Sequence, residues 1–311
     1  MTTGKNSRGM IAVDKIGTRV LFVNPQTYAT EVVIDGFPRT VHELLIMPEA
    51  GLAYVPIFGD GIHGRNPNPG HLVAVIDLIK RAHVRDIDMR PYIAPHTLRR
   101  GSDGLVYITC ENSAVVAVID PADHKVVEVI DSGSTNGHRL VISSDGRWLY
   151  TENEEDATIS VIDLTNRKLV RKTATPRPLA GIALSGDDRT VVAVDDEQPT
   201  LFLIDTTRES VVATVPLDGV AAAAQIARYN ADFSLLGVTS IKSNTVSLID
   251  PSFREQQAIK VGSQPMDMAF RGDELFVACQ GDGSVHVVDI SGARVKHVFQ
   301  AGTGCESLGF F

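Results

Sequence analysis

The sequence predicts an all-β fold, a seven-bladed β-propeller of four-stranded blades. Three observations support this fold: a strand motif that recurs at a nearly constant interval, apolar residues without a long helical period, and two chain ends that each carry part of one repeat. The 311 residues, 43% of them hydrophobic, are enough to bury the large core of such a ring. We therefore expect a single closed domain over residues 1–311.

The repeat is clearest in a strand that ends in aspartate. Successive aspartates lie 43, 43, 42, 45 and 39 residues apart. An interval in this range, with about four short strands in each unit, is typical of a propeller blade. LFVN, ending at Asn24, is a further copy near the start of the chain. The aspartate-ending copies are LVAVID (Asp77), VVAVID (Asp120), ISVID (Asp163), LFLID (Asp205), VSLID (Asp250) and VHVVD (Asp289).

The strands around this motif follow a constant order. In the unit that starts at His138, the runs HRLVIS, RWLYTE, ISVID and KLVRKT are separated by the turn segments SSDG and ENEEDAT. The runs are rich in β-branched and aromatic residues, and the breakers fall between them, as expected for sheet. The complete blades are predicted at about 37–90, 91–133, 134–175, 176–218, 219–262 and 263–300.

The two chain ends complete the seventh blade. Residues 302–311, GTGCESLGFF, resemble the first strand of a unit and then stop, whereas residues 10–36 supply three strands without a first one. Together they make one blade. Closing the ring in this way removes the free sheet edges that a linear array would expose.

The repeats resemble those of the YVTN-type seven-bladed propellers. The segments RPLAGIALSGDDRTVVAV, GRWLYTENEEDATISVID and ELFVACQGDGSVHVVDIS carry the resemblance, which extends over essentially the whole chain. It implies the seven-bladed fold. It does not decide function, because this scaffold hosts binding modules, lyases and oxidoreductases alike.

One position of the repeat carries the functional hypothesis. It is the residue that opens the first strand of each unit, and in a propeller this strand is the innermost one, so that the residue lies near the mouth of the central channel. Histidine stands there in three consecutive units, two residues before a leucine in each case. Ring closure places a glutamate in the neighbouring unit. In order, the slot holds His42, His96, His138, Ala180, Ala224 or Gln225, Met266 and Glu306.

Imidazole nitrogens and a carboxylate that converge on one point are suitable ligands for a borderline divalent cation. The sequence thus predicts a metal site made by His42, His96, His138 and Glu306, with Mn, Fe, Zn, Ni or Cu as the ion. The alternative is that these are unrelated polar side chains that hold loops or ordered water. Arg139 and Glu43 follow slot residues directly, and strand alternation predicts that Arg139 points away from the channel and that Glu43 does the same.

A long loop in the first complete blade supplies candidate catalytic residues. IFGDGIHGRNPNPGH contains His63, a candidate general acid or base, and Arg65, a candidate anchor for a substrate carboxylate. The alternative is a surface loop stiffened by Pro67 and Pro69. Further candidates on the same face include the strand-end residue Glu111.

Three functions are consistent with this pattern. The arrangement is similar, by architecture, to oligogalacturonate lyases and streptogramin lyases, and this resemblance implies a metal-dependent lyase, or a related isomerase or hydrolase, acting on a medium-sized organic substrate. The second hypothesis is a non-haem iron or copper oxygenase, by analogy with carotenoid-cleaving oxygenases. The third is a propeller without catalytic activity that binds a partner on its face.

Charge and composition argue against some classes of binding partner. The net charge of −9 and the pI near 5.5 argue against nucleic acid or an anionic membrane as a partner, because both attract basic surfaces. The first ten residues lack the apolar run of a secretory signal, so a cytoplasmic location is expected. Cys110, Cys279 and Cys305 form no metal-binding or disulfide pattern, and we expect them to be reduced and mostly buried.

Overall fold

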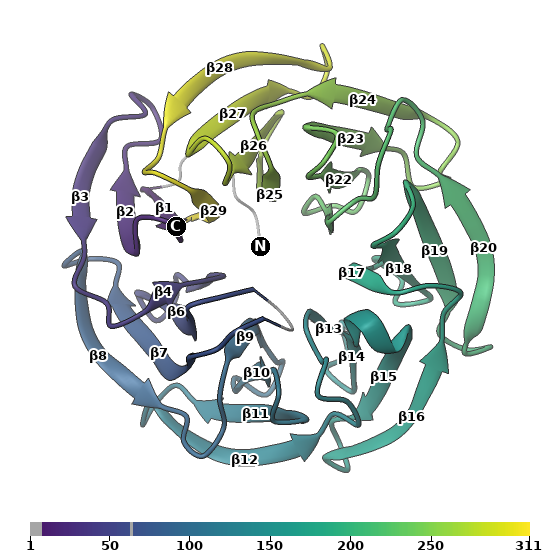
Figure 1. Cartoon of the computed structure of the whole chain (residues 1–311), viewed down its shortest axis with the longest axis horizontal. Helices are drawn as coiled ribbons and strands as arrows, with labels where there is room; N and C mark the ends of the chain where they lie inside the picture. The colour runs from purple at the N-terminus through teal and green to yellow at the C-terminus, as the bar shows by residue number, and fades with distance from the viewer. Residues whose placement is uncertain (1–7, 63–64) are drawn as a thin grey trace.

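The structure is a ring of seven β-sheets around a central axis (Figure 1). It is a computed structural model, and it describes residues 8–62 and 65–311. Six sheets have four strands, and the seventh has five because its inner strand is divided in two. The predicted all-β, seven-bladed propeller is confirmed. No helix in the described part of the chain is long and apolar enough to cross a membrane.

One blade joins the two ends of the chain. The C-terminal strand β29 is its inner strand and pairs with β1, so that Met10 lies opposite Phe310 and Ala12 opposite Leu308. The predicted ring closure is therefore correct. The strands of this closing blade, from the channel outward, are β29 (Cys305–Phe310), β1 (Met10–Asp14), β2 (Arg19–Val23) and β3 (Thr30–Ile34).

The next three blades bring the three slot histidines to the channel. The first of them has its inner strand divided into β4 and β5, both paired with β6. In chain order, the elements of the three blades are β4 (Thr40–Val41), β5 (Leu45–Met47), β6 (Leu52–Gly59), β7 (Pro69–Asp77) and β8 (Ala82–Asp88); β9 (Pro95–Arg100), β10 (Val106–Cys110), β11 (Val115–Asp120) and β12 (Lys125–Asp131); and β13 (Leu140–Ile142), β14 (Trp148–Glu152), the short 3-10 helix η1 (Glu154–Asp156), β15 (Thr158–Asp163) and β16 (Lys168–Ala174).

The remaining three blades complete the ring. Their elements are β17 (Leu179–Leu184), β18 (Thr190–Asp195), β19 (Thr200–Asp205) and β20 (Ser210–Pro216); β21 (Ile226–Tyr229), β22 (Leu236–Ser240), β23 (Thr245–Ile249) and β24 (Gln256–Lys260); and β25 (Pro265–Arg271), β26 (Glu274–Cys279), β27 (Ser284–Asp289) and β28 (Arg294–Gln300).

The aspartate that ends each third strand has a local structural role. Asp77 accepts hydrogen bonds from the backbone N–H groups of Ile79 and Lys80 at 2.9 and 2.8 Å. Asn24 makes the same turn with the N–H groups of Gln26 and Thr27, both at 2.9 Å. A short polar side chain that binds the backbone two and three residues on stabilises a tight turn. The repeated motif therefore marks the turn from the third to the fourth strand.

Apolar side chains fill the space between neighbouring blades. In one of these clusters, Phe276 of β26 and Leu308 and Phe310 of β29 pack with Ala12 and Leu21 of the closing blade. Burial of this kind is the main favourable contribution to folding. The three cysteines are buried and free of disulfides, as expected.

Candidate metal centre

The predicted slot coincides with an irregularity of the inner strands. The register of the inner strand shifts around His96 in β9, Ala180 in β17, Met266 in β25 and Glu306 in β29. A β-bulge adds an unpaired residue and turns its side chain in a new direction, and bulges are common beside functional sites. His42 lies in the break between β4 and β5, and His138 lies just before β13. The repeat thus places an irregular backbone position at the channel mouth of each of these blades.

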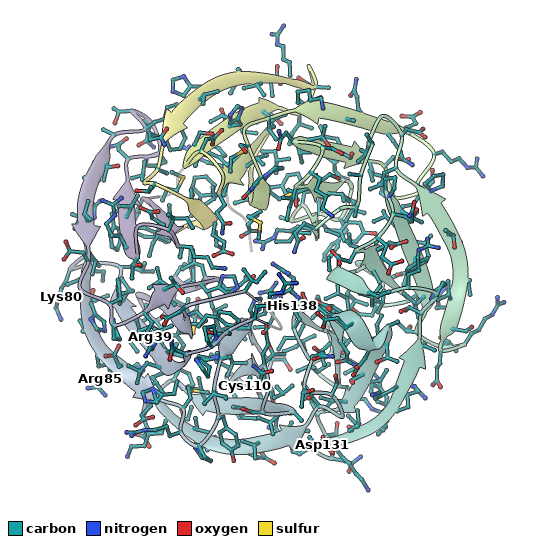
Figure 2. The ribbon with its side chains drawn as sticks, in the orientation of Figure 1. Arg39, Lys80, Arg85, Cys110, Asp131 and His138 are labelled. Carbon is teal, nitrogen blue, oxygen red and sulfur yellow. The ribbon has the colours of Figure 1, made fainter. Side chains whose placement is uncertain are left out.

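The structure brings the three slot histidines into direct contact. The Nε2 atoms of His42 and His96 lie 2.5 Å apart. The ring centroid of His96 lies 4.2 Å from that of His42 and 4.1 Å from that of His138. All three side chains are buried, with at most 4% of each residue exposed. His138 lies close to the centre of the ring (Figure 2). Their role as metal ligands stays a prediction.

A separate partner contacts Nδ1 of each histidine. Nδ1 of His42 lies 2.6 Å from Oε2 of Glu306, and Nδ1 of His138 lies 2.7 Å from Oε1 of Glu152. Nδ1 of His96 lies 3.0 Å from Oγ1 of Thr97. Metal-binding histidines commonly use one ring nitrogen as ligand and donate from the other to a carboxylate or oxygen that fixes the ring. These Nδ1 contacts are therefore of the kind that hold the ring of a metal-binding histidine in place.

Glu306 belongs to this group of partners. Its Oε2 contacts His42, and its Oε1 accepts a hydrogen bond from Nζ of Lys15 at 3.1 Å. Burial of the carboxyl opposes ionisation, but electrostatic attraction and hydrogen bonds from the neighbouring His42 and Lys15 outweigh it and lower the pKa of Glu306 to about 2. Glu306 is therefore an ionised carboxylate with a protein contact on each oxygen.

Another carboxylate lies near the Nε2 atoms of two of the histidines. Oε1 of Glu111 lies 3.7 Å from Nε2 of His96 and 4.0 Å from Nε2 of His138. The ligand atoms of these three residues all lie within 4.8 Å of one another, and the same is true of His42, Glu43 and His96. Glu111 directly follows the second strand of its blade. From sequence it is only a further candidate for this face. Its strand-end position was the one available signal.

The expectation that Arg139 and Glu43 point away from the channel is wrong. Arg139 lines the channel mouth, and its Nη1 lies 3.2 Å from both ring nitrogens of His138. Its Nη2 lies 3.2 Å from Oε1 of Glu43. Alternation holds only within a regular strand. Glu43 lies in the break between β4 and β5 with a positive φ of 52°, and Arg139 precedes β13, so that neither residue obeys it.

Burial sets the protonation of the central residues. The pKa of His96 is well below its ordinary value because of burial and, after that, the nearby charges of His138 and His42. A neutral imidazole is the form that binds a metal. The pKa of Glu152 is well above its ordinary value because of burial and the neighbouring Glu154 carboxylate. The site therefore favours a neutral His96 that needs to release no proton to become a ligand.

A cavity of about 360 Å³ opens above the histidines. Its side away from the histidines mixes apolar and polar side chains, because Met266 and Leu179 line it together with Gln225, Gln264 and Gln280. Of the two candidates for the slot in this blade, Ala224 and Gln225, it is Gln225 that lines the cavity. The volume is at the lower end of the range for small-molecule sites.

Of the predicted catalytic pair, only Arg65 belongs to the part of the chain that the structure describes. His63 lies outside the described residues. Arg65 is exposed, makes an isolated bridge to Ile62, and is not among the described residues that line the cavity. Ile62, from the same loop, does line it.

Solved structures share the fold. Hydrazine synthase from Kuenenia stuttgartiensis matches with a TM-score of 0.75 and 14% identity over 97% of this chain and 94% of that chain. A functionally unknown protein from Desulfotomaculum acetoxidans DSM 771 matches with a TM-score of 0.80 and 11% identity over 98% of this chain and 99% of that chain. At these identities the similarity concerns the fold alone. No curated protein matches the chain.

One family model matches residues 100–305, which is more than half of the chain, and its description is "Cytochrome D1 heme domain". The match supports a propeller with a transition-metal cofactor in the broad sense. It does not confirm the YVTN-type assignment, and it offers no support for a lyase. The chain belongs to the cytochrome D1 heme domain family.

Proposed function

We propose that this protein is a metal-dependent enzyme with a single non-haem transition-metal ion bound by Nε2 of His42, His96 and His138. The observation that carries the proposal is the convergence of these imidazoles, with Nδ1 of each one in contact with a different partner. At metal–nitrogen distances of about 2.0–2.1 Å, two ligand nitrogens lie roughly 3 Å apart. The 2.5 Å between the Nε2 atoms of His42 and His96 is within a small ring rotation of that separation.

We assign the carboxylate position of the site to Glu111 instead of Glu306. Glu111 faces Nε2 of both His96 and His138, whereas Glu306 already contacts Nδ1 of His42 and Nζ of Lys15. Three histidines and one carboxylate then make a mixed nitrogen and oxygen ligand set, which suits a borderline divalent transition metal. Glu306 then serves to orient His42 and to increase the basicity of its ring.

The family description raises a haem as a second candidate cofactor. In a haem the macrocycle occupies the plane around the iron, and the protein supplies axial ligands only. Three imidazoles whose neighbouring ring centroids lie 4.1–4.2 Å apart cannot all be axial ligands, and no macrocycle fits between Nε2 atoms 2.5 Å apart. The three histidines as arranged therefore fit an ion and do not fit a haem.

We infer a redox reaction on a small polar molecule as the activity. A bound transition metal would supply either electron transfer or Lewis-acid polarisation of a ligand. The chain contributes a pocket of about 360 Å³ with many polar side chains in its lining. The cations in this lining, Lys15 and Arg139, already pair with Glu306 and Glu43, and the further carboxylates Glu154, Glu155 and Asp196 favour a bound cation. The alternative activity is that of a lyase, which the sequence suggested by its similarity in architecture to propeller lyases. Turnover without a change of oxidation state would support it.

The experiment is metal analysis of untagged protein combined with its absorption spectrum. We expect about one transition-metal ion per chain and no haem absorption band. His42→Ala, His96→Ala and His138→Ala should each lose the ion, whereas His83→Ala, at an exposed histidine that pairs with Asp86, should keep it. Full metal occupancy in all three slot variants, or a stoichiometric haem, would contradict the proposal.

A further inference from the structure

A second and larger cavity lies toward the other end of the channel. It has a volume of about 1280 Å³ and is lined by the distal ends of the same inner strands that carry the slot residues. In β9, Arg99 follows His96 by three positions, and in β29, Leu308 follows Glu306 by two. At about 3.3 Å per residue, the two sites lie roughly 7–10 Å apart along a strand. We call the two ends the histidine mouth (His42, His96 and His138) and the arginine mouth (Arg99 and Arg228).

The arginine mouth combines apolar walls with cationic side chains. Its lining includes four arginines and a single carboxylate, Glu49, which pairs with Arg100. Of these arginines, Arg81 pairs with Glu31 and Arg228 pairs with Asp267. The apolar part of the lining comes from the closing blade and its neighbours, and it includes Leu44, Ile46, Phe270, Leu308 and Phe310.

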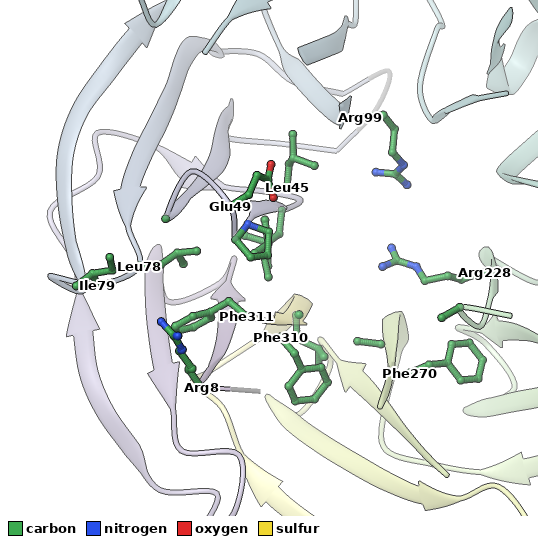
Figure 3. Close-up of a pocket in the computed structure, with 18 of the residues that line it drawn as sticks. Arg8, Leu45, Glu49, Leu78, Ile79, Arg99, Arg228, Phe270, Phe310 and Phe311 are labelled. Atoms are coloured by element: carbon green, nitrogen blue, oxygen red, sulfur yellow. The ribbon is translucent and has the colours of Figure 1, made fainter. Parts of the chain in front are cut away.

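Two of the arginines face each other across the cavity (Figure 3). Nη2 of Arg228 pairs with Oδ1 of Asp267 at 2.8 Å, and its side chain is 34% exposed. Arg99 is partly buried and donates to its neighbour's carbonyl, that of Leu98, at 2.7 Å. Among the described residues, no carboxylate lies within ion-pairing distance of Arg99. The cavity therefore contains a guanidinium group with donors available to a ligand.

The electrostatics of the pair agree with this geometry. Burial, followed by the positive charge of Arg228, lowers the pKa of Arg99 to about 10. The carboxylates of Glu43 and Asp267 act in the opposite direction but do not restore the ordinary pKa, so an anion placed between the two guanidinium groups would further reduce their repulsion. A planar carboxylate matches the fork of a guanidinium group and can bind it with two parallel hydrogen bonds.

We propose that the arginine mouth binds an amphipathic monocarboxylate, with its carboxylate between Arg99 and Arg228 and its hydrocarbon part on Leu308, Phe310 and Phe270. The apolar walls disfavour a compact inorganic anion, because they would remain hydrated. The arginines disfavour a neutral hydrocarbon, because their charges would lose water without gaining a partner. Only a ligand with both parts satisfies both surfaces.

The test is titration calorimetry of the full chain with octanoate, octanol and acetate. Octanoate should bind at least about tenfold more tightly than either of the others, because it alone offers both the anion and the chain. Lengthening the acid from hexanoate to octanoate should raise the affinity by about fourfold per methylene buried. Equal binding of octanol and octanoate, or no binding of octanoate, would overturn the proposal.

A variant pair locates the site. Arg99→Gln should weaken octanoate binding by about tenfold or more, and Arg99→Lys should restore part of it. The matched control is Arg254→Gln, at an exposed arginine that is not part of this cavity, and it should bind octanoate like the unmodified protein. Unchanged octanoate affinity in Arg99→Gln would place the ligand elsewhere and overturn the assignment.

Discussion

The two mouths of the channel are built from the same inner strands but have different chemistry. At the histidine mouth, the side chains come from irregular backbone positions, are buried, and contact one another directly. At the arginine mouth, β9 is regularly paired and Arg99 lies opposite Tyr107, while the cavity is more than three times larger. The comparison indicates that the bulges concentrate polar ligands at one end. The regular ends leave space for a larger, partly apolar molecule at the other.

The largest effect should come from removing the strand that reaches both mouths. Deletion of residues 302–311 removes β29, which carries Glu306 at one end and Leu308 and Phe310 at the other. The closing blade would lose its inner strand, and β1 would lose one of its two pairing partners. We expect loss of the cooperative melting transition and of both binding functions. A truncated chain that melts like the full one would show that the ring does not depend on this closure.

Loss of one histidine should abolish binding at the histidine mouth and leave binding at the arginine mouth unchanged. His96→Ala removes the central imidazole of the three, so metal should be lost while octanoate binding at the arginine mouth persists. The melting temperature should fall by less than about 5 °C, because the imidazole contributes little to the apolar clusters between blades. Metal content, calorimetry and thermal melting measure the three quantities. Parallel loss of metal and octanoate binding would mean that the mouths form one site.

Two carboxamide variants rank the carboxylates of the histidine mouth. Glu111→Gln should weaken metal binding more than Glu306→Gln, because we assign Glu111 as a ligand and Glu306 as the partner of His42. Loss of such an orienting partner typically costs about 10–100-fold in metal affinity. Competition with a chelator gives both affinities. The opposite ranking would restore Glu306 as the ligand, as the sequence pattern predicts.

The smallest effect concerns acid stability at the junction of the chain ends. Asp14 accepts hydrogen bonds from the N–H groups of Thr303 and Gly304 at 2.9 and 2.7 Å, and it pairs with Arg19. Burial raises its pKa, but these hydrogen bonds and those from Gly17 and Arg19 outweigh it, so the pKa of folded Asp14 lies below the ordinary value of 3.8.

Its contribution to stability should therefore be complete above the unfolded pKa of about 3.9 and decline as the pH falls toward the lower folded pKa. Thermal melting of the wild type and Asp14→Asn between about pH 2 and 7 measures the difference. The variant should be less stable at neutral pH, and the gap should narrow in acid. A gap that stays constant with pH would show that the Asp14 charge is not the cause.

Much of this architecture follows from sequence alone. The interval between the aspartate-ending strands predicts the blades, and the incomplete repeats at the two ends predict the shared blade that β29 and β1 form. Reading the repeats in register also predicts that His42, His96, His138 and Glu306 lie together, because equivalent positions of a closed ring face the same channel. Sequence can make these predictions because the repeat is periodic along the chain, and because the incomplete repeats at the two ends complement each other.

Only the tertiary structure decided how the side chains use that position. Alternation placed Arg139 and Glu43 outside the channel, but the breaks in the inner strands turn both into it. The contacts of Glu306 with His42 and Lys15, and the approach of Glu111 to His96, depend on which atom of each side chain points inward. The arginine mouth joins Arg99 and Arg228 from blades far apart in the chain. The direction in which each irregular position turns its side chain, and the contacts across the ring, set these features, and both depend on residues that are far apart in the chain.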